Sequence, residues 1–210
     1  MIQGSEEWFN AKRGFVGASV MADVMAKGKN GAEAATRRNL KARIVAERLT
    51  GQSPESFTSA AIQHGIEHEP IARALYEVSR GVDVEQVGFI LHPEIKMTGA
   101  SPDGLIGDKG LIEIKCPNTA NHIDYLLCGT APAEYHRQML WQMECTGREW
   151  CDFVSYDPRM PDDMQLFVVR FLRDDDRIKE MREGVIKFLE EVDDVLFKLQ
   201  AYRESKKEQA

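Results

Sequence analysis

Two acidic residues and a lysine in the middle of the chain could form a catalytic metal site. Asp103 lies in the turn sequence Ser-Pro-Asp-Gly, and Glu113 and Lys115 follow in the apolar segment Leu-Ile-Glu-Ile-Lys. Because strand side chains alternate between faces, Glu113 and Lys115 are expected on one face and Ile112 and Ile114 on the other, in the core. Carboxylates suit Mg²⁺ or Mn²⁺, and a neighbouring amine can orient water and stabilise charge. The pattern predicts hydrolysis of a phosphodiester bond.

Each half of this pattern also has an explanation without chemistry. Ser-Pro-Asp-Gly is a favourable β-turn, and Glu-Ile-Lys is common on solvated strand faces where charges pair across strands. The combination of a turn aspartate with an acid-X-Lys segment ten residues later favours the metal site. Asp103 and Glu113 would supply side-chain oxygens, and the backbone carbonyl of Ile114 could supply another.

Length and composition predict a single globular domain over residues 1–210. The apolar and charged fractions, 43% and 29%, are ordinary for such a domain. There is no apolar run of about 18 residues and no signal peptide, so we expect a cytoplasmic protein with no membrane partner. The four cysteines contain no C-x-x-C pair and are expected to be reduced and mostly buried.

The net charge of −7 is unusual for a protein that binds DNA, but the charge is unevenly distributed. Much of the acidic excess follows Asp174. One segment near the N-terminus carries seven basic residues against Glu33 and Glu47: Lys27, Lys29, Arg37, Arg38, Lys41, Arg43 and Arg48. This segment predicts either a local phosphate-binding face or a solvated helix face.

The order of hydrophobic patterns predicts an α/β (α+β) fold with a central mixed sheet flanked by helices. Ser19 is expected to cap the first helix, Pro70 to kink or split the third, and residues after Arg203 to fray. The long C-terminal helix has apolar residues every three or four positions, for packing on its own domain or on another subunit. We expect helices at 20–26, 40–49, 59–79, 118–127, 132–146 and 174–203, and strands at 84–91, 96–100, 104–106, 110–115, 150–156 and 164–171.

The segment Asp103…Glu113-Ile-Lys115 resembles the core motif of the PD-(D/E)XK nucleases. More narrowly, Gly99-Ala-Ser-Pro-Asp-Gly-Leu and Leu111-Ile-Glu-Ile-Lys-Cys-Pro are similar to the lambda-exonuclease-like (YqaJ-type) viral recombinases. Further similar blocks follow the family's order from about residue 8 to 160: Trp8…Gly14…Ala18-Ser19, Gly65-x-x-x-Glu69, Tyr135-x-x-Gln138 and Tyr156-Asp-Pro-Arg-Met160.

The resemblance implies a restriction-endonuclease-like fold and roles for further residues. Glu69 would complete the metal site of Asp103, Glu113 and Ile114, and would join Asp103, Glu113 and Lys115 in the catalytic set. The family also has an arginine two residues before the glycine of its first block, where this chain has Lys12 followed by Arg13. The residues expected to hold the 5′-phosphate of a DNA end are Lys12 or Arg13 together with Ser19, Ser101 and Gln138.

The activity that the resemblance implies is a Mg²⁺-dependent 5′-to-3′ exonuclease. Such an enzyme degrades one strand of linear double-stranded DNA to 5′-mononucleotides and leaves a 3′ overhang for phage-type single-strand annealing recombination; Mn²⁺ should substitute for Mg²⁺. The resemblance also implies a homotrimeric ring around DNA, a single-strand annealing protein as partner, and a phage or prophage protein in a bacterial host.

Three other functions remain open at this stage. A PD-(D/E)XK endonuclease of restriction or repair type would use the same metal site. A DNA-end binder would keep the end-binding residues without hydrolysis. His64-Gly-Ile-Glu67-His68 also matches an inverted zinc-protease motif, although the sequence offers no clear third ligand.

Overall fold

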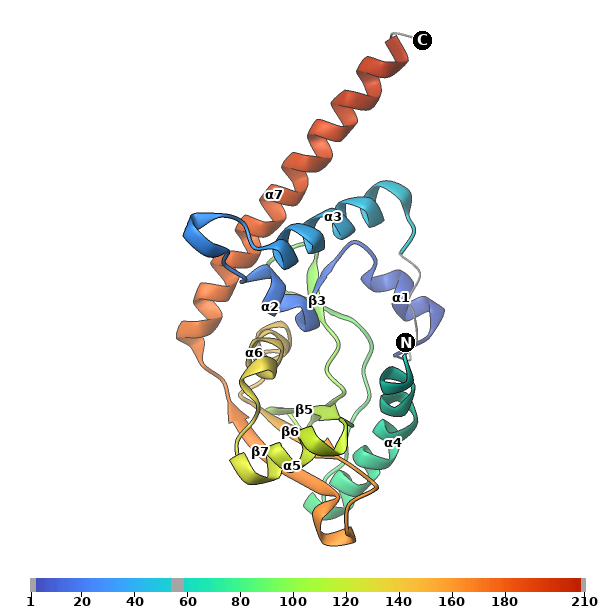
Figure 1. The fold of residues 1–210 in the computed structure, drawn as a ribbon, viewed down its shortest axis with the longest axis vertical. Helices are drawn as coiled ribbons and strands as arrows, with labels where there is room; N and C mark the ends of the chain where they lie inside the picture. The colour runs from blue at the N-terminus through green and yellow to red at the C-terminus, as the bar shows by residue number, and fades with distance from the viewer. Residues whose placement is uncertain (1–2, 54–58, 209–210) are drawn as a thin grey trace.

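The computed structural model describes residues 3–53 and 59–208 (Figure 1). The helices are α1 (Glu6–Lys12), η1 (Ala18–Val20), α2 (Met21–Val24), η2 (Lys29–Gly31), α3 (Ala35–Thr50), α4 (Ala60–Arg80), α5 (Thr119–Cys128), α6 (Ala133–Thr146), η3 (Asp162–Met164) and α7 (Asp175–Glu208). The strands are β1 (Val16–Gly17), β2 (Ile90–Leu91), β3 (Thr98–Ala100), β4 (Gly104–Ile106), β5 (Gly110–Lys115), β6 (Trp150–Tyr156) and β7 (Leu166–Leu172). This order confirms the predicted α/β class.

The strands form two mixed sheets instead of one central sheet. The smaller sheet has the order β1-β3-β2, and the larger has the order β4-β5-β6-β7, in which β5 and β6 are parallel. The division falls at the Ser101–Asp103 turn between β3 and β4, where Pro102 has no N–H to donate to a ladder. The turn that carries Asp103 therefore lies where the two sheets meet.

Alternation along β5 places Glu113 and Lys115 on one face and Ile112 and Ile114 on the other, as predicted, and the two faces meet different hydrophobic clusters. Leu111 packs with residues of α2, α3, α6 and α7, whereas Ile112 and Ile114 pack with residues of α4. Glu113 and Lys115 point to the same side as Leu111, and Lys115 Nζ lies 2.5 Å from Glu113 Oε1. The larger sheet thus separates α4 from the other helices and brings two charged side chains out on one face.

Several predicted elements need correction. Ser19 is not an N-cap: it lies within η1, whose N-cap is Gly17, and no side chain caps α2. The helix expected at 20–26 is reduced to the single turn of α2, which follows β1 and the 3₁₀ turn η1. The strand expected at 84–91 is mostly extended chain that crosses between the sheets: Glu85 bridges to Leu105 of β4, and only β2 pairs with β3.

The long helices differ from expectation only in detail. Helix α4 begins after its N-cap Ser59, ends at the left-handed Gly81, and is not split at Pro70. Helix α7 continues beyond Arg203 to Glu208, through residues that favour helix. No described helix is long and apolar enough to cross a membrane.

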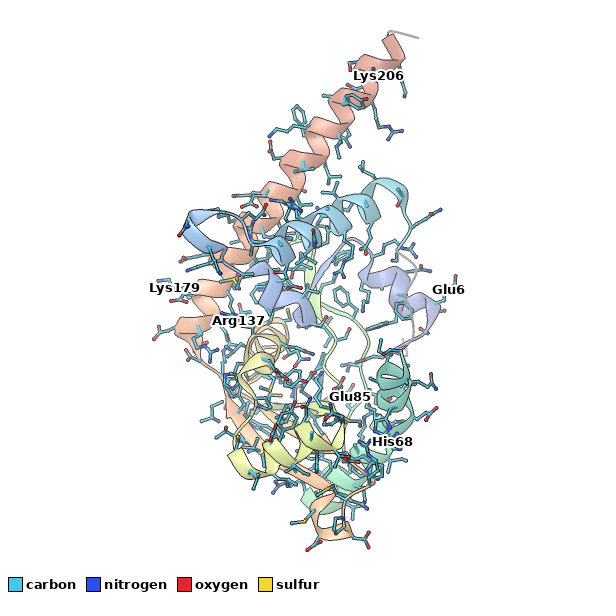
Figure 2. The ribbon with its side chains drawn as sticks, in the orientation of Figure 1. Glu6, His68, Glu85, Arg137, Lys179 and Lys206 are labelled. Atoms are coloured by element: carbon cyan, nitrogen blue, oxygen red, sulfur yellow. The ribbon has the colours of Figure 1, made fainter. Side chains whose placement is uncertain are left out.

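The C-terminal helix packs on the body of the protein from its start to about Leu196. Most of its apolar residues from Ile178 to Val192 are buried, as predicted for packing on its own domain, although Ile186 is 43% exposed. Beyond that point the side chains of Phe197 and Tyr202 are 71% and 59% exposed. The last turns, near Lys206, project clear of the remaining elements (Figure 2).

Candidate active site

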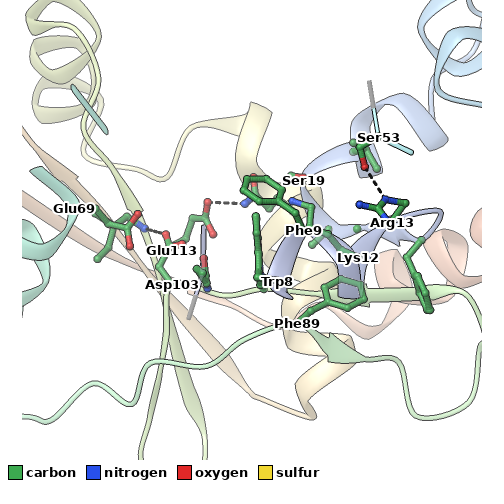
Figure 3. Close-up of a pocket in the computed structure, with 18 of the residues that line it drawn as sticks. Trp8, Phe9, Lys12, Arg13, Ser19, Ser53, Glu69, Phe89, Asp103 and Glu113 are labelled. Carbon is green, nitrogen blue, oxygen red and sulfur yellow. Dashed lines mark hydrogen bonds between the residues drawn. The ribbon is translucent and has the colours of Figure 1, made fainter. Parts of the chain in front are cut away.

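A cleft of about 660 Å³ contains all the residues predicted to act on DNA (Figure 3). Carboxylates lie at one end, aromatic side chains in the middle, and Lys12 and Arg13 at the other end. The predicted residues in its lining are Lys12, Arg13, Ser19, Glu69, Ser101, Asp103, Glu113, Ile114, Lys115 and Gln138. The fold therefore brings together residues that are more than a hundred positions apart in the sequence.

Asp103 is held against β5 by its own turn. Its backbone N–H donates to the carbonyl of Ile112 at 3.2 Å, and its Oδ2 accepts from the backbone N–H of Ile114 at 2.6 Å. The turn thus folds back on the strand and places the carboxylate beside Glu113. The predicted juxtaposition of Asp103 and β5 is present in the structure.

Glu113 is 1% exposed and hydrogen-bonded at both oxygens. Gln138 Nε2 donates to Oε1 at 2.6 Å, and Gln142 Nε2 donates to Oε2 at 2.6 Å. The two amides lie one turn apart on α6 and therefore share a helix face. Together with the Lys115 ammonium, they satisfy the buried carboxylate. Gln138, expected at the 5′-phosphate, is thus bonded to a predicted metal ligand.

Glu69 reaches the cleft from α4, the helix that packs on the Ile112 and Ile114 face of the larger sheet. Its carboxylate is paired with Arg73, one turn further along the helix. The side chain of Arg73 is 10% exposed and that of Glu69 is 35% exposed, so the pair runs from the interior to the cleft wall. Arg73 thereby directs the Glu69 side chain.

Burial and neighbouring charges shift the pKa values of Asp103 and Lys115 at the carboxylate end. Burial raises the pKa of Asp103 well above its usual range, and the neighbouring Glu113 and Glu69 carboxylates raise it further. Burial opposes the charge of Lys115, but Glu113 and Asp103 outweigh that effect and raise its pKa. Lys115 is therefore an ammonium at neutral pH.

The carboxylate end has the chemical character of a site for a divalent cation. Three carboxylates influence one another there, and hard oxygen donors are what Mg²⁺ and Mn²⁺ require. Within residues 3–53 and 59–208, however, no three acidic, histidine or cysteine side chains surround a common point. Asp103 Oδ2 and both oxygens of Glu113 accept hydrogen bonds from N–H donors instead. A bound cation would therefore have to replace donors such as the Lys115 ammonium on Glu113.

Lys12 and Arg13 lie at the opposite end of the cleft. Lys12 Nζ is 3.6 Å from the centre of the Trp8 ring. Burial, followed by repulsion from Arg43, lowers the pKa of Lys12 to about 8, against an opposing contribution from Glu47. Arg13 donates to Asn10 Oδ1 at 2.5 Å and to Ser53 Oγ at 3.3 Å.

Trp8 connects the two ends of the cleft. Its Nε1 donates to Ser101 Oγ at 2.9 Å, while its ring carries the Lys12 ammonium. Ser101 is two residues from Asp103, so one rigid side chain spans from the turn that carries Asp103 to the cationic end.

Sequence reasoning missed two residues that make hydrogen bonds to predicted site residues, Gln142 and Arg73. Gln142 and Arg73 each follow a predicted site residue, Gln138 and Glu69, by four positions. Helical periodicity would have found them once the two helices were accepted. Arg43 lines the cationic end but belongs to α3, and no local signal distinguishes it from the other basic residues of that segment.

Three of the seven cations of the basic segment form close ion pairs with acidic residues. Arg37 and Lys41 pair with Glu33 and with Glu191 of α7. Arg48 pairs with Asp193 of the same helix. These cations therefore hold α3 against α7, and Arg43 is the member of the segment that lines the cleft.

The histidines of the protease-like motif pack on each other. The rings of His64 and His68 lie 4.1 Å apart, and His68 Nδ1 lies 2.8 Å from the carbonyl oxygen of His64. Neither ring is part of a three-ligand group in the described part of the chain.

Of the four cysteines, all free, Cys145 and Cys151 are buried, while Cys116 is half-buried and Cys128 exposed.

Known proteins resemble this chain over most of its length. Among solved structures, the alkaline exonuclease LHK-Exo from Laribacter hongkongensis is 50% identical, with a TM-score of 0.90 over 96% of this chain and 99% of that chain. The complex of LHK-Exo with dAMP gives the same values. A phage-related exonuclease from Haemophilus somnus 129PT shares the fold at 19% identity, with a TM-score of 0.71 over 88% of this chain and 96% of that chain. None of the curated proteins matches the chain.

The amino-acid sequence also matches a known protein family. Residues 7–149 match the YqaJ-like viral recombinase domain, and this range includes every predicted site residue. This match and the 50% identity to LHK-Exo show that the chain belongs to the YqaJ-like viral recombinase family.

Proposed function

We propose that this protein is a Mg²⁺-dependent 5′-to-3′ exonuclease that degrades one strand of linear double-stranded DNA to 5′-mononucleotides. The observation that carries the proposal is the single cleft that joins buried carboxylates and Lys115 to a cationic end. One end is suited to phosphodiester hydrolysis and the other to a terminal phosphate. The identity to LHK-Exo, an exonuclease with a dAMP complex, supports the same chemistry here.

The carboxylate end would carry out the hydrolysis. The side chains of Asp103, Glu113 and Glu69 and the carbonyl of Ile114 would hold Mg²⁺, or Mn²⁺ in its place. The cation, when bound, supplies a Lewis acid that polarises the phosphate and activates water. Lys115 is protonated in the free protein, so it can donate hydrogen bonds that orient the attacking water and stabilise charge in the transition state.

The cationic end would fix the DNA terminus. Lys12 and Arg13, with the neutral donors Ser19, Ser101 and Gln138, would bind the 5′-phosphate. If the 5′ terminus is held at a fixed distance from the carboxylates, each hydrolysis of the strand would release one nucleotide. This relation between the two ends supports 5′-mononucleotides as products.

The biological setting follows from the family. We propose a homotrimeric ring whose channel encloses DNA and a 3′ overhang that passes to a single-strand annealing protein during phage-type recombination. A ring would need only its channel to be basic, which is compatible with a net charge of −7.

Digestion of linear duplex DNA in Mg²⁺ tests the proposal. One strand should carry a 5′-phosphate and the other a 5′-hydroxyl, with closed circular DNA as control. We expect loss of the phosphorylated strand, 5′-mononucleotide products and an intact circle. A cut circle would instead identify a PD-(D/E)XK endonuclease, and no hydrolysis with either Mg²⁺ or Mn²⁺ would contradict the nuclease assignment.

A further inference from the structure

Arg43 lies beside the segment that carries Lys12. The backbone of Gly14 is joined to α3 at both polar groups: its N–H donates to Glu47 Oε2 at 2.8 Å, and its carbonyl accepts from Arg48 Nε at 2.9 Å. Gly14 has a φ of +74°, and a Cβ there would lie 2.9 Å from Arg48 Cγ, so this close approach requires glycine. Arg43 is one turn before Glu47 on the same helix, which brings its guanidinium to the end of the cleft lined by Lys12.

Arg43 is less closely paired with carboxylates than three other basic residues of α3. Arg37, Lys41 and Arg48 each have a carboxylate oxygen within 3.0 Å, and their side chains are only 12–17% exposed. The side chain of Arg43 is 45% exposed, and its closest described carboxylate is Glu47, at 3.8 Å from Nε to Oε1. Glu47 is itself hydrogen-bonded to Gly14.

The other two cations at this end are arranged differently. Arg13 is directed to Asn10 and Ser53, both uncharged. Lys12 lies on the Trp8 ring, with no carboxylate within ion-pair distance among the described residues. Repulsion from Arg43 contributes to the lowered pKa of Lys12, so the two cations are close enough to destabilise each other. An anion bound between them would relieve that repulsion.

We propose that Arg43 binds the terminal 5′-phosphate together with Lys12 and determines the preference for phosphorylated ends. The inference rests on the proposed function and adds a residue from a different element. A lysine binds phosphate as a point charge, whereas a guanidinium offers two parallel N–H donors to two phosphate oxygens. Arg43 would supply from α3 the planar group that position 12 lacks. A phosphate monoester, carrying nearly two negative charges, fits two cations better than an internal diester does.

A binding experiment tests Arg43 independently of hydrolysis. The affinity of the protein is measured in EDTA for two otherwise identical duplexes, one with a 5′-phosphate and one with a 5′-hydroxyl. For Arg43→Gln we expect the preference for the phosphorylated duplex to fall at least about tenfold, the loss typical of charge-assisted hydrogen bonds. Arg43→Lys should retain part of the preference. The matched control is Arg38→Gln, an exposed arginine on the same helix that does not line the cleft, and it should leave the preference unchanged.

The outcomes separate this inference from the proposed function. If Arg43→Gln keeps the wild-type preference while Lys12→Ala loses it, Arg43 has no part in end recognition. If the wild-type protein binds both duplexes equally, the inference is also wrong, whether or not the protein hydrolyses DNA. A wild-type protein that prefers phosphorylated ends through Arg43 but shows no hydrolysis in Mg²⁺ would support the inference and contradict the nuclease. Thermal unfolding of each variant checks that the fold is intact.

Discussion

The side-chain amide of Gln142 donates a 2.6 Å hydrogen bond to Glu113 Oε2, at a position where both residues are at most 1% exposed. Gln138 donates to the other oxygen from one turn earlier on α6. Gln138 lines the cleft, whereas Gln142 is fully buried behind it. Gln142 can therefore hold Glu113 in position without contacting DNA, and it leaves its own Oε1 buried with no partner in the described chain.

Replacing Gln142 tests its role in orienting Glu113. Gln142→Leu keeps the approximate volume but leaves Glu113 Oε2 buried without a donor, at a cost of about 1–3 kcal/mol. We expect a higher Mg²⁺ concentration for half-maximal hydrolysis and a lower kcat, with binding of duplex DNA in EDTA unchanged. Gln200→Leu, on the exposed part of α7, is the control for the same chemical change. An unaltered Mg²⁺ requirement would mean that Gln142 serves packing alone.

Lys115→Ala tests the proposed catalytic role of Lys115. The change removes the ammonium that lies 2.5 Å from Glu113 Oε1 and leaves the acidic residues without their cation. We expect hydrolysis to fall to between about one-hundredth and one-thousandth of wild type, the range typical for loss of a transition-state donor. Duplex binding in EDTA should persist, and Asp103→Asn should weaken Mg²⁺ binding as well as turnover. Normal turnover by Lys115→Ala, measured with labelled linear duplex, would show that the assignment is wrong.

The variant also has a stability signature. Without Lys115, repulsion between Glu113 and Asp103 should lower the melting temperature in EDTA at pH 8. Added Mg²⁺ should restore more stability to the variant than to the wild type, because a bound cation then replaces the missing charge. Equal Mg²⁺ stabilisation of both proteins would argue against a shared site for the cation and the ammonium.

The sequence predicts the local geometry of this site better than its surroundings. The alternation that places Glu113 and Lys115 on one face of β5 is a property of any strand, and the turn that carries Asp103 is encoded in four residues. By contrast, the contact of Arg43 with the cleft depends on how α3 packs on the Gly14 segment, which no local pattern specifies. The same holds for the division into two sheets. Ser19 was misplaced because its capping propensity was outweighed by the chain entering η1 from β1.

The ion pairs between α3 and α7 give a prediction for acid stability. Hydrogen bonding to Arg37, with a further contribution from Lys41, lowers the pKa of Glu191 to about 2. Because the folded pKa lies below the unfolded value of about 4.3, this stabilisation is present at pH 7 and is lost as the pH falls towards 2. Glu191→Gln should lower the free energy of unfolding at pH 7 by about 1 kcal/mol, allowing for solvent screening.

Denaturant unfolding measures this effect, and the difference between wild type and Glu191→Gln should shrink as the pH is lowered below 4. Asp194→Asn is the control, because its pair with Lys198 is exposed on α7 and should contribute little. A constant difference between wild type and Glu191→Gln across this pH range would show that the carboxylate charge is not the source of the stability.

The lowered pKa of Lys12 predicts a pH dependence at the cationic end. With a pKa of about 8 in the free protein, Lys12 is charged below pH 8 and becomes neutral above it. The preference for a 5′-phosphorylated over a 5′-hydroxyl duplex in EDTA should therefore decrease as the pH rises above 8. The midpoint should lie higher than 8, because the bound phosphate favours the charged amine. Lys12→Arg keeps its charge throughout and should retain the preference up to about pH 10. A wild-type preference that is constant from pH 7 to 10 would exclude Lys12 as the titrating phosphate ligand and leave Arg13 or Arg43 to provide the charge.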